Sequence, residues 1–77
     1  MENIEVNSVY KHYKGNYYKV LNIAIHTETV EKMVIYQALY GENLIWCRPA
    51  SIWNDRVEFN GENIKRFELI KDYYGKV

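Results

Sequence analysis

The stretch YYKVLNIAIHTETVEKMVIYQALY, residues 17–40, decides the fold class of this chain. Its two ends, residues 17–26 and 33–40, are rich in β-branched and aromatic residues, which favour extended strands. The polar segment TETVEK lies between them and has the length of a hairpin loop of four to six residues. The stretch therefore predicts a long antiparallel β-hairpin.

Both faces of this predicted hairpin are largely apolar. With His26 opposite Met33, one face holds Tyr18, Val20, Ala24, His26, Met33, Ile35 and Leu39, and the other holds Leu21, Ile23, Ile25, Val34, Tyr36, Ala38 and Tyr40. A sheet with one solvated face does not need a second apolar face, but a sheet that bends over its own core does. A β-bulge near Asn22 would help that bend.

The rest of the chain adds shorter strands and turns. GEN (41–43) predicts a turn, LIWCR (44–48) a strand that Pro49 ends, and PASIWN a helical turn with Pro49 at its first position. Asn60-Gly61 is the preferred pair of a two-residue type I′ hairpin, and RFELI predicts the last strand. We therefore predict a mostly β fold: a small SH3-like barrel of five to six short antiparallel strands with at most one short helical turn.

Length and composition describe one folded domain over residues 1–77, with a core of about residues 8–70 and a flexible tail at 71–77. The chain is 48% hydrophobic and 26% charged, and its ten basic and ten acidic side chains cancel. A neutral chain argues against a dedicated nucleic-acid binder, which is usually basic. With a single cysteine, no signal peptide and no long apolar run, the sequence predicts a cytoplasmic monomer without a membrane partner.

The histidines are the first candidates for chemistry. His12, His26, Glu28 and Cys47 show none of the usual zinc-ligand spacings, so we expect no metal and no cofactor. The histidines also have structural interpretations: His26 would hydrogen-bond the turn after its strand, and His12 would order the loop around Gly15.

No arrangement typical of nucleophilic catalysis is visible, and we assign no catalytic residue. Cys47 is expected to be a small buried apolar side chain. Arg48 would bind an anion bidentately or pair with Glu28 or Glu58. An enzyme is less favoured than a binding protein, although a small enzyme with a His/Glu acid–base pair stays open.

Several segments resemble the bacterial family called domain of unknown function 1653: YKHYKGNYYKVLNIAIHTET, VIYQALYG, WCRP and the closing RF. The resemblance runs from residue 10 to about 70 and implies an SH3-like barrel without an assigned reaction. The positions that match the family pattern are Tyr10, His12, Tyr13, Lys14, Gly15, His26, Glu28, Thr29, Tyr36, Trp46, Arg48 and Pro49. The chain departs from the pattern at Asn22, Ile25, Cys47 and Lys65.

The leading functional hypothesis is a non-catalytic module that binds a small anion or a partner bearing phosphate or carboxylate. Its predicted site gathers His12, Tyr13, Lys14, His26, Glu28 and Arg48 at one end of the barrel. The alternative is a single-stranded RNA-binding face of Tyr10, Lys11, Tyr17 and Lys19, where rings would stack on bases and lysines meet phosphates. A protein partner that docks on Tyr40, Trp46 and Trp53 is also open.

Overall fold

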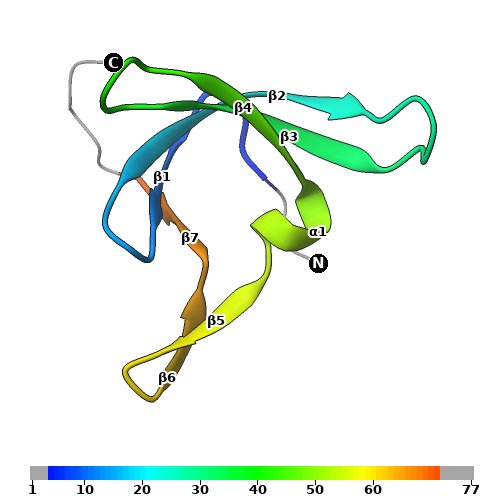
Figure 1. Ribbon diagram of the computed structural model, residues 1–77. Coiled ribbons are helices and arrows are strands. Elements are labelled where there is room, and N and C mark those ends of the chain that lie inside the picture. The colour runs from blue at the N-terminus through cyan, green and yellow to red at the C-terminus, as the bar shows by residue number, and fades with distance from the viewer. Residues whose placement is uncertain (1–3, 72–77) are drawn as a thin grey trace.

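The computed structural model describes residues 4–71, in which β-strands are the main regular structure (Figure 1). The strands are β1 (Val9–His12), β2 (Tyr17–Ile25), β3 (Lys32–Ala38), β4 (Ile45–Pro49), β5 (Arg56–Phe59), β6 (Glu62–Lys65) and β7 (Phe67–Ile70), and the helix α1 spans Ala50–Trp53. The predicted mostly β class is confirmed, with β1 as a strand that the sequence pattern had not shown. Of the predicted tail, only Lys71 lies within the described residues.

Five strands form one antiparallel sheet in the order β4-β3-β2-β1-β7, and β5 and β6 form a separate hairpin. Within residues 4–71, β4 and β7 are the two edges of the larger sheet, so its hydrogen bonds do not close a barrel. The sheet curves instead, with α1 below β3 and β4 and the β5–β6 hairpin extending away from it (Figure 1). No helix in this part of the chain is long and apolar enough to cross a membrane.

A β-bulge in β2 produces the bend. Val20 pairs with Tyr36 and Ile23 pairs with Val34, so the register shifts by one residue beside Asn22, where the sequence predicted it. The extra residue exchanges the two faces of the strand. Val20 and Ile23 therefore both contact the core, although regular alternation would place two residues three positions apart on opposite faces.

The predicted pairing of His26 with Met33 is wrong. Met33 pairs with Ala24, and β2 ends at Ile25. His26 belongs to the turn, where its N–H donates to the carbonyl of Glu31 over 2.8 Å. The predicted faces are wrong for Tyr18 and Val20, which pair with Ala38 and Tyr36, because the prediction assumed an unbroken alternation through the bulge.

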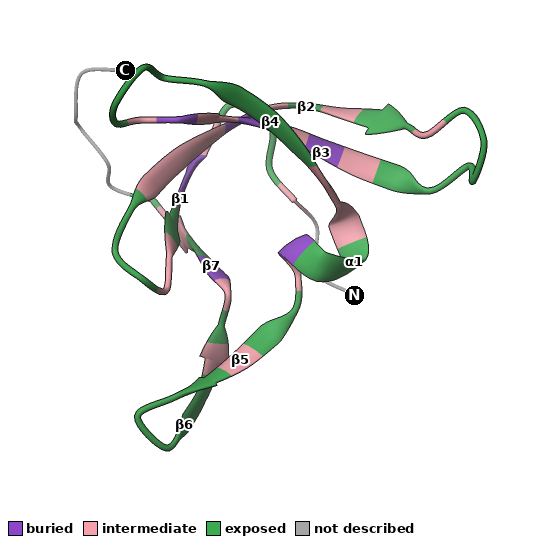
Figure 2. Cartoon of the chain, viewed as in Figure 1, coloured by how far each residue is buried: buried purple, intermediate pink, exposed green. Residues whose placement is uncertain are grey.

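Stacked aromatic rings fill the core. Its buried residues are Tyr10, Val20, Val34, Tyr36, Trp53 and Phe67. Trp53 lies parallel to Phe67 with 3.7 Å between ring centroids, and Tyr10 and Tyr36 meet Trp53 at steep angles. Figure 2 shows buried segments on β1, β3, β7 and α1, the elements that border the inside of the curve. Since each large ring buries about 150–250 Å², few residues are needed to stabilise this small domain.

The β5–β6 hairpin closes through the predicted two-residue turn. Asn60 and Gly61 have φ angles of 53° and 81°, and Phe59 pairs with Glu62. Positive φ at both turn residues is the requirement of a type I′ turn, which the Asn-Gly pair meets at low cost. The hairpin leads directly into β7 and so returns Arg66 to the end of β1, where the Arg66 carbonyl accepts the Tyr13 N–H over 2.9 Å.

Candidate functional site

His12 ends β1 on the concave side of the sheet. It pairs with Phe67 across β1 and β7, and the two rings meet at a steep angle with centroids 4.9 Å apart. The His12 Nδ1 atom accepts the Lys14 N–H over 3.2 Å, as expected for a histidine that orders the loop before Gly15. A neutral ring that accepts at Nδ1 carries its proton on Nε2. The Nε2–H donor is then left for a ligand.

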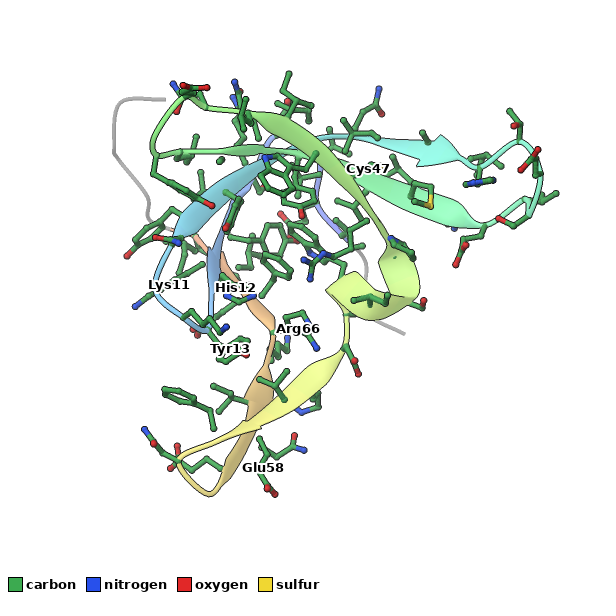
Figure 3. All side chains as sticks on the ribbon, viewed as in Figure 1. Lys11, His12, Tyr13, Cys47, Glu58 and Arg66 are labelled. Atoms are coloured by element: carbon green, nitrogen blue, oxygen red, sulfur yellow. The ribbon has the colours of Figure 1, made fainter. Side chains whose placement is uncertain are left out.

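Positive charges surround His12. Burial, followed by the charges of Arg48, Arg66 and Lys14, lowers the pKa of the imidazole below its usual value of 6.5. The guanidinium carbon of Arg48 lies 5.3 Å from the centroid of the Phe67 ring. Figure 3 shows His12, Tyr13 and Arg66 at the same inner side of the fold. We call His12, Arg48 and Arg66 the cationic cluster.

The cationic cluster has few acidic neighbours. Asp55 approaches Arg66 at 3.8 Å, and Arg66 is one-quarter exposed. No carboxylate within residues 4–71 comes within ion-pair distance of Arg48, so neither predicted partner, Glu28 or Glu58, pairs with it. The Arg66 Nε atom is buried and has no hydrogen-bond acceptor among residues 4–71. Hydrogen-bond donors therefore outnumber acceptors here.

His26 and Glu28 lie in a different part of the molecule. The nine residues of β2 separate the turn that holds them from the end of β1, and nine residues at about 3.3 Å each make roughly 30 Å of strand. The His26 Nδ1 atom accepts the N–H groups of Glu28 and Thr29 over 3.2 and 3.3 Å, which confirms its structural role in the turn.

The predicted six-residue site therefore does not form as one site. His12, Tyr13, Lys14 and Arg48 gather around the end of β1, whereas the length of the hairpin carries His26 and Glu28 to its far tip.

Two tyrosines extend the aromatic surface beside the cationic cluster. The Tyr18 ring centroid lies 6.3 Å from that of His12, and the Tyr18 hydroxyl hydrogen-bonds the Tyr40 hydroxyl over 2.8 Å. Burial, the Tyr40 hydrogen bond and the neighbouring Tyr40 and Tyr36 raise the pKa of Tyr18 to about 12. Tyr18 therefore stays neutral and offers a ring and a hydroxyl, not a charge.

A groove of about 430 Å³ continues from His12 along the β5–β6 hairpin. Its lining residues are Lys11, His12, Tyr13, Arg56, Asn63, Ile64, Lys65 and Glu68. Among these lining residues three are basic and one, Glu68, is acidic. Arg56 is held in place by the side chain and the carbonyl of Asn63. The approach to the cationic cluster is thus also positive.

The predicted nucleic-acid face is only partly present. The prediction that Tyr10 belongs to this face is wrong, because its side chain is part of the core and only 6% exposed. Lys11 and Tyr17 pair across β1 and β2, with the Lys11 Nζ 5.9 Å from the Tyr17 ring centroid. Lys19 pairs with Val9 further along the same strands. Of the two tyrosines predicted for this face, Tyr17 is the one that lies outside the buried core.

The family follows from a comparison with known sequences. The sequence model of the family described as protein of unknown function (DUF1653) matches residues 8–69. The chain belongs to the DUF1653 family. A crystal structure of a DUF1653 protein from Bordetella bronchiseptica is similar to this chain, with a TM-score of 0.80 and 31% sequence identity over 94% of this chain and 95% of that one. Among curated proteins, no match is found.

The cationic cluster of this DUF1653 chain includes Arg66, a residue that the sequence-based prediction of the site did not include. It is adjacent to Phe67 in sequence, and the closing Arg-Phe pair of the family resemblance was the signal for it. Two other predictions are corrected. Cys47 is exposed on β4, and Trp53 is buried and closed to a docking partner. Residues 4–71 contain no group of three or more metal-ligating side chains close enough to hold an ion.

Proposed function

We propose that this DUF1653 chain is a non-catalytic, cytoplasmic binding module that holds a phosphate or carboxylate group in the cationic cluster. The observation that carries the proposal is the state of Arg48. Its guanidinium is half-buried against Phe67, and no carboxylate of residues 4–71 pairs with it. A charge withdrawn from water is costly unless it is paired, and a bound anion would supply the partner.

The donors of the cluster suit an oxyanion. A guanidinium presents parallel N–H groups in one plane and binds phosphate or carboxylate bidentately. The Nε2–H of His12 adds a donor of a different direction, and Arg66 adds a second positive charge. Phe67, which contacts both His12 and Arg48, fixes the two side chains relative to each other.

The arrangement does not favour an acid–base enzyme. Within the described residues, no carboxylate lies within ion-pair distance of His12, and the His26 ring is engaged by the N–H groups of its own turn. A general base needs its partner within hydrogen-bond reach. Binding, not proton transfer, is the chemistry that these groups support.

The test is a titration of isotope-labelled protein with sodium phosphate, and separately with citrate, at constant ionic strength. Amide resonances of His12, Lys14, Arg48, Arg66 and Phe67 should shift together and saturate. Hydrogen bonds to charged groups contribute about 1.5–3 kcal/mol, and about 1.4 kcal/mol is a factor of ten. We therefore expect Arg48→Gln to weaken binding roughly ten- to a hundredfold.

Lys32→Gln is the matched control, because it removes one positive charge from an exposed position at the far end of β3. It should leave the affinity unchanged. Chemical shifts that fail to saturate, or an equal loss of affinity in both variants, would contradict the proposal. Either result would show that the anion responds to the net charge of the protein and that the cationic cluster is not a binding site.

A further inference from the structure

β4 is an edge strand, and none of the described strands pairs with its outer side. Within residues 4–71 it pairs only with β3. The Ala38 N–H donates to the Leu44 carbonyl over 3.0 Å, and hydrogen-bonded pairs alternate along an antiparallel ladder. The even-numbered residues of β4 therefore bond to β3. Ile45 and Cys47 direct their N–H and C=O groups away from the sheet.

The side chains at this edge are also unusually apolar. Four large exposed apolar side chains fall within nine residues: Leu44 (53% exposed), Ile45 (61%), Trp46 (49%) and Ile52 (42%). Natural edge strands are normally protected by charges, prolines, bulges or covering elements. β4 has one charged residue, Arg48, and one proline, Pro49 at its end, so the segment before them is suited to pairing with another strand.

We propose that β4 pairs with β4 of a second copy of this chain, antiparallel and centred on Cys47. In this register the two Cys47 residues exchange a pair of backbone hydrogen bonds. Ile45 lies opposite Pro49 of the second copy and donates its N–H to that carbonyl. Pro49 lacks an N–H, so the Ile45 carbonyl of the second copy receives no donor and the Ile45–Pro49 pair at each end keeps one hydrogen bond instead of two.

The side chains on one face of this register complement each other. Trp46 of one copy lies directly opposite Arg48 of the other, in a non-hydrogen-bonded pair, where side chains come closest. A guanidinium stacks favourably on an indole ring, and two-fold symmetry makes the contact twice. A second copy thus supplies an aromatic partner for Arg48 and a cationic partner for Trp46. An unrelated peptide would need to carry both kinds of residue at the same spacing.

This proposal does not depend on the anion-binding function. A guanidinium stacks through its faces and donates within its plane, so stacking of Trp46 leaves the Arg48 donors available to an anion. The paired segment is only five residues long. We therefore expect a weak dimer at the small end of the range of specific interfaces, one that forms as concentration rises.

Disulfide trapping of the unmodified chain tests the register. Hydrogen-bonded antiparallel partners have Cα atoms about 5.5 Å apart, within the span that a disulfide bridges. Diamide, which accepts the two electrons and two protons of a thiol pair, should therefore link two chains through Cys47. The matched control is Ile45→Cys combined with Cys47→Ser. Its two thiols would be separated by about 14 Å of strand and should not react.

Sedimentation equilibrium under reducing conditions tests the dimer itself. The mass should rise from monomer toward dimer with concentration. Trp46→Lys, which sets a lysine against Arg48 of the second copy, should return the chain to a monomer. Phe59→Lys is a comparable change of an exposed aromatic residue on β5, and it should leave the dimer intact.

Three outcomes overturn the proposal. They are a monomer at every concentration, a cross-link at position 45 as efficient as at Cys47, and a dimer that Trp46→Lys leaves intact. A monomer that instead binds an extended segment of another protein along β4 also overturns it. None of these outcomes affects the phosphate titration, so the two proposals fail separately.

Discussion

The pKa of His12 is set by its burial and by the positive charges around it. Burial, followed by the charges of two arginines and a lysine, disfavours the protonated form. A bound anion would reverse that effect, because negative charge nearby favours the imidazolium. His12 therefore connects the occupancy of the cationic cluster to pH.

The pKa shift of His12 has a defined consequence for stability. The folded pKa lies below the unfolded value of 6.5, so the unfolded chain binds more protons between these two values. The free energy of unfolding should fall as the pH drops from about 6.5 through the lowered pKa. We expect His12→Gln to reduce this slope, measured by urea unfolding at a series of pH values. An equal pH dependence of the unfolding free energy in the variant and the natural chain would show that His12 is not its source.

At the scale of the element, α1 is a four-residue helix whose main contribution is Trp53. Trp53 is 1% exposed and stacks on Phe67, whereas its neighbour Ile52 is 42% exposed. Trp53→Ala should cost about 3–5 kcal/mol of unfolding free energy, the usual loss for a large buried ring. Ile52→Ala should change it by about 0.5 kcal/mol or less. Urea unfolding in dilute protein compares the two, and similar losses would show that α1 does not anchor the core.

Elements with strong local signals were predictable from the sequence. The Asn60-Gly61 turn and the long hairpin were both indicated by residues close together in the chain. β1 was not, because its strand character depends on pairing with β2 on one side and with β7 on the other. The inward face of β2 was also missed, since one bulge residue inverts every later assignment.

At the scale of the whole molecule, the candidate site was only half predictable. His12, Tyr13, Lys14 and Arg48 do gather, but His26 and Glu28 are carried away by the length of β2. Arg66 joins them because β7 pairs with β1, which brings the two ends of the domain together. Such a non-local pairing leaves no periodic signal in the sequence.

The two tryptophans give this protein its own optical probes. Trp53 lies in the core and Trp46 lies half-exposed on the open edge. Iodide ions should quench the fluorescence of Trp46 in the folded chain and that of both residues after unfolding. Quenching measurements on Trp46→Phe would then isolate the core signal, and full quenching of that variant in its folded state would contradict the burial of Trp53. Emission from one chain would thus report separately on the edge and on the interior.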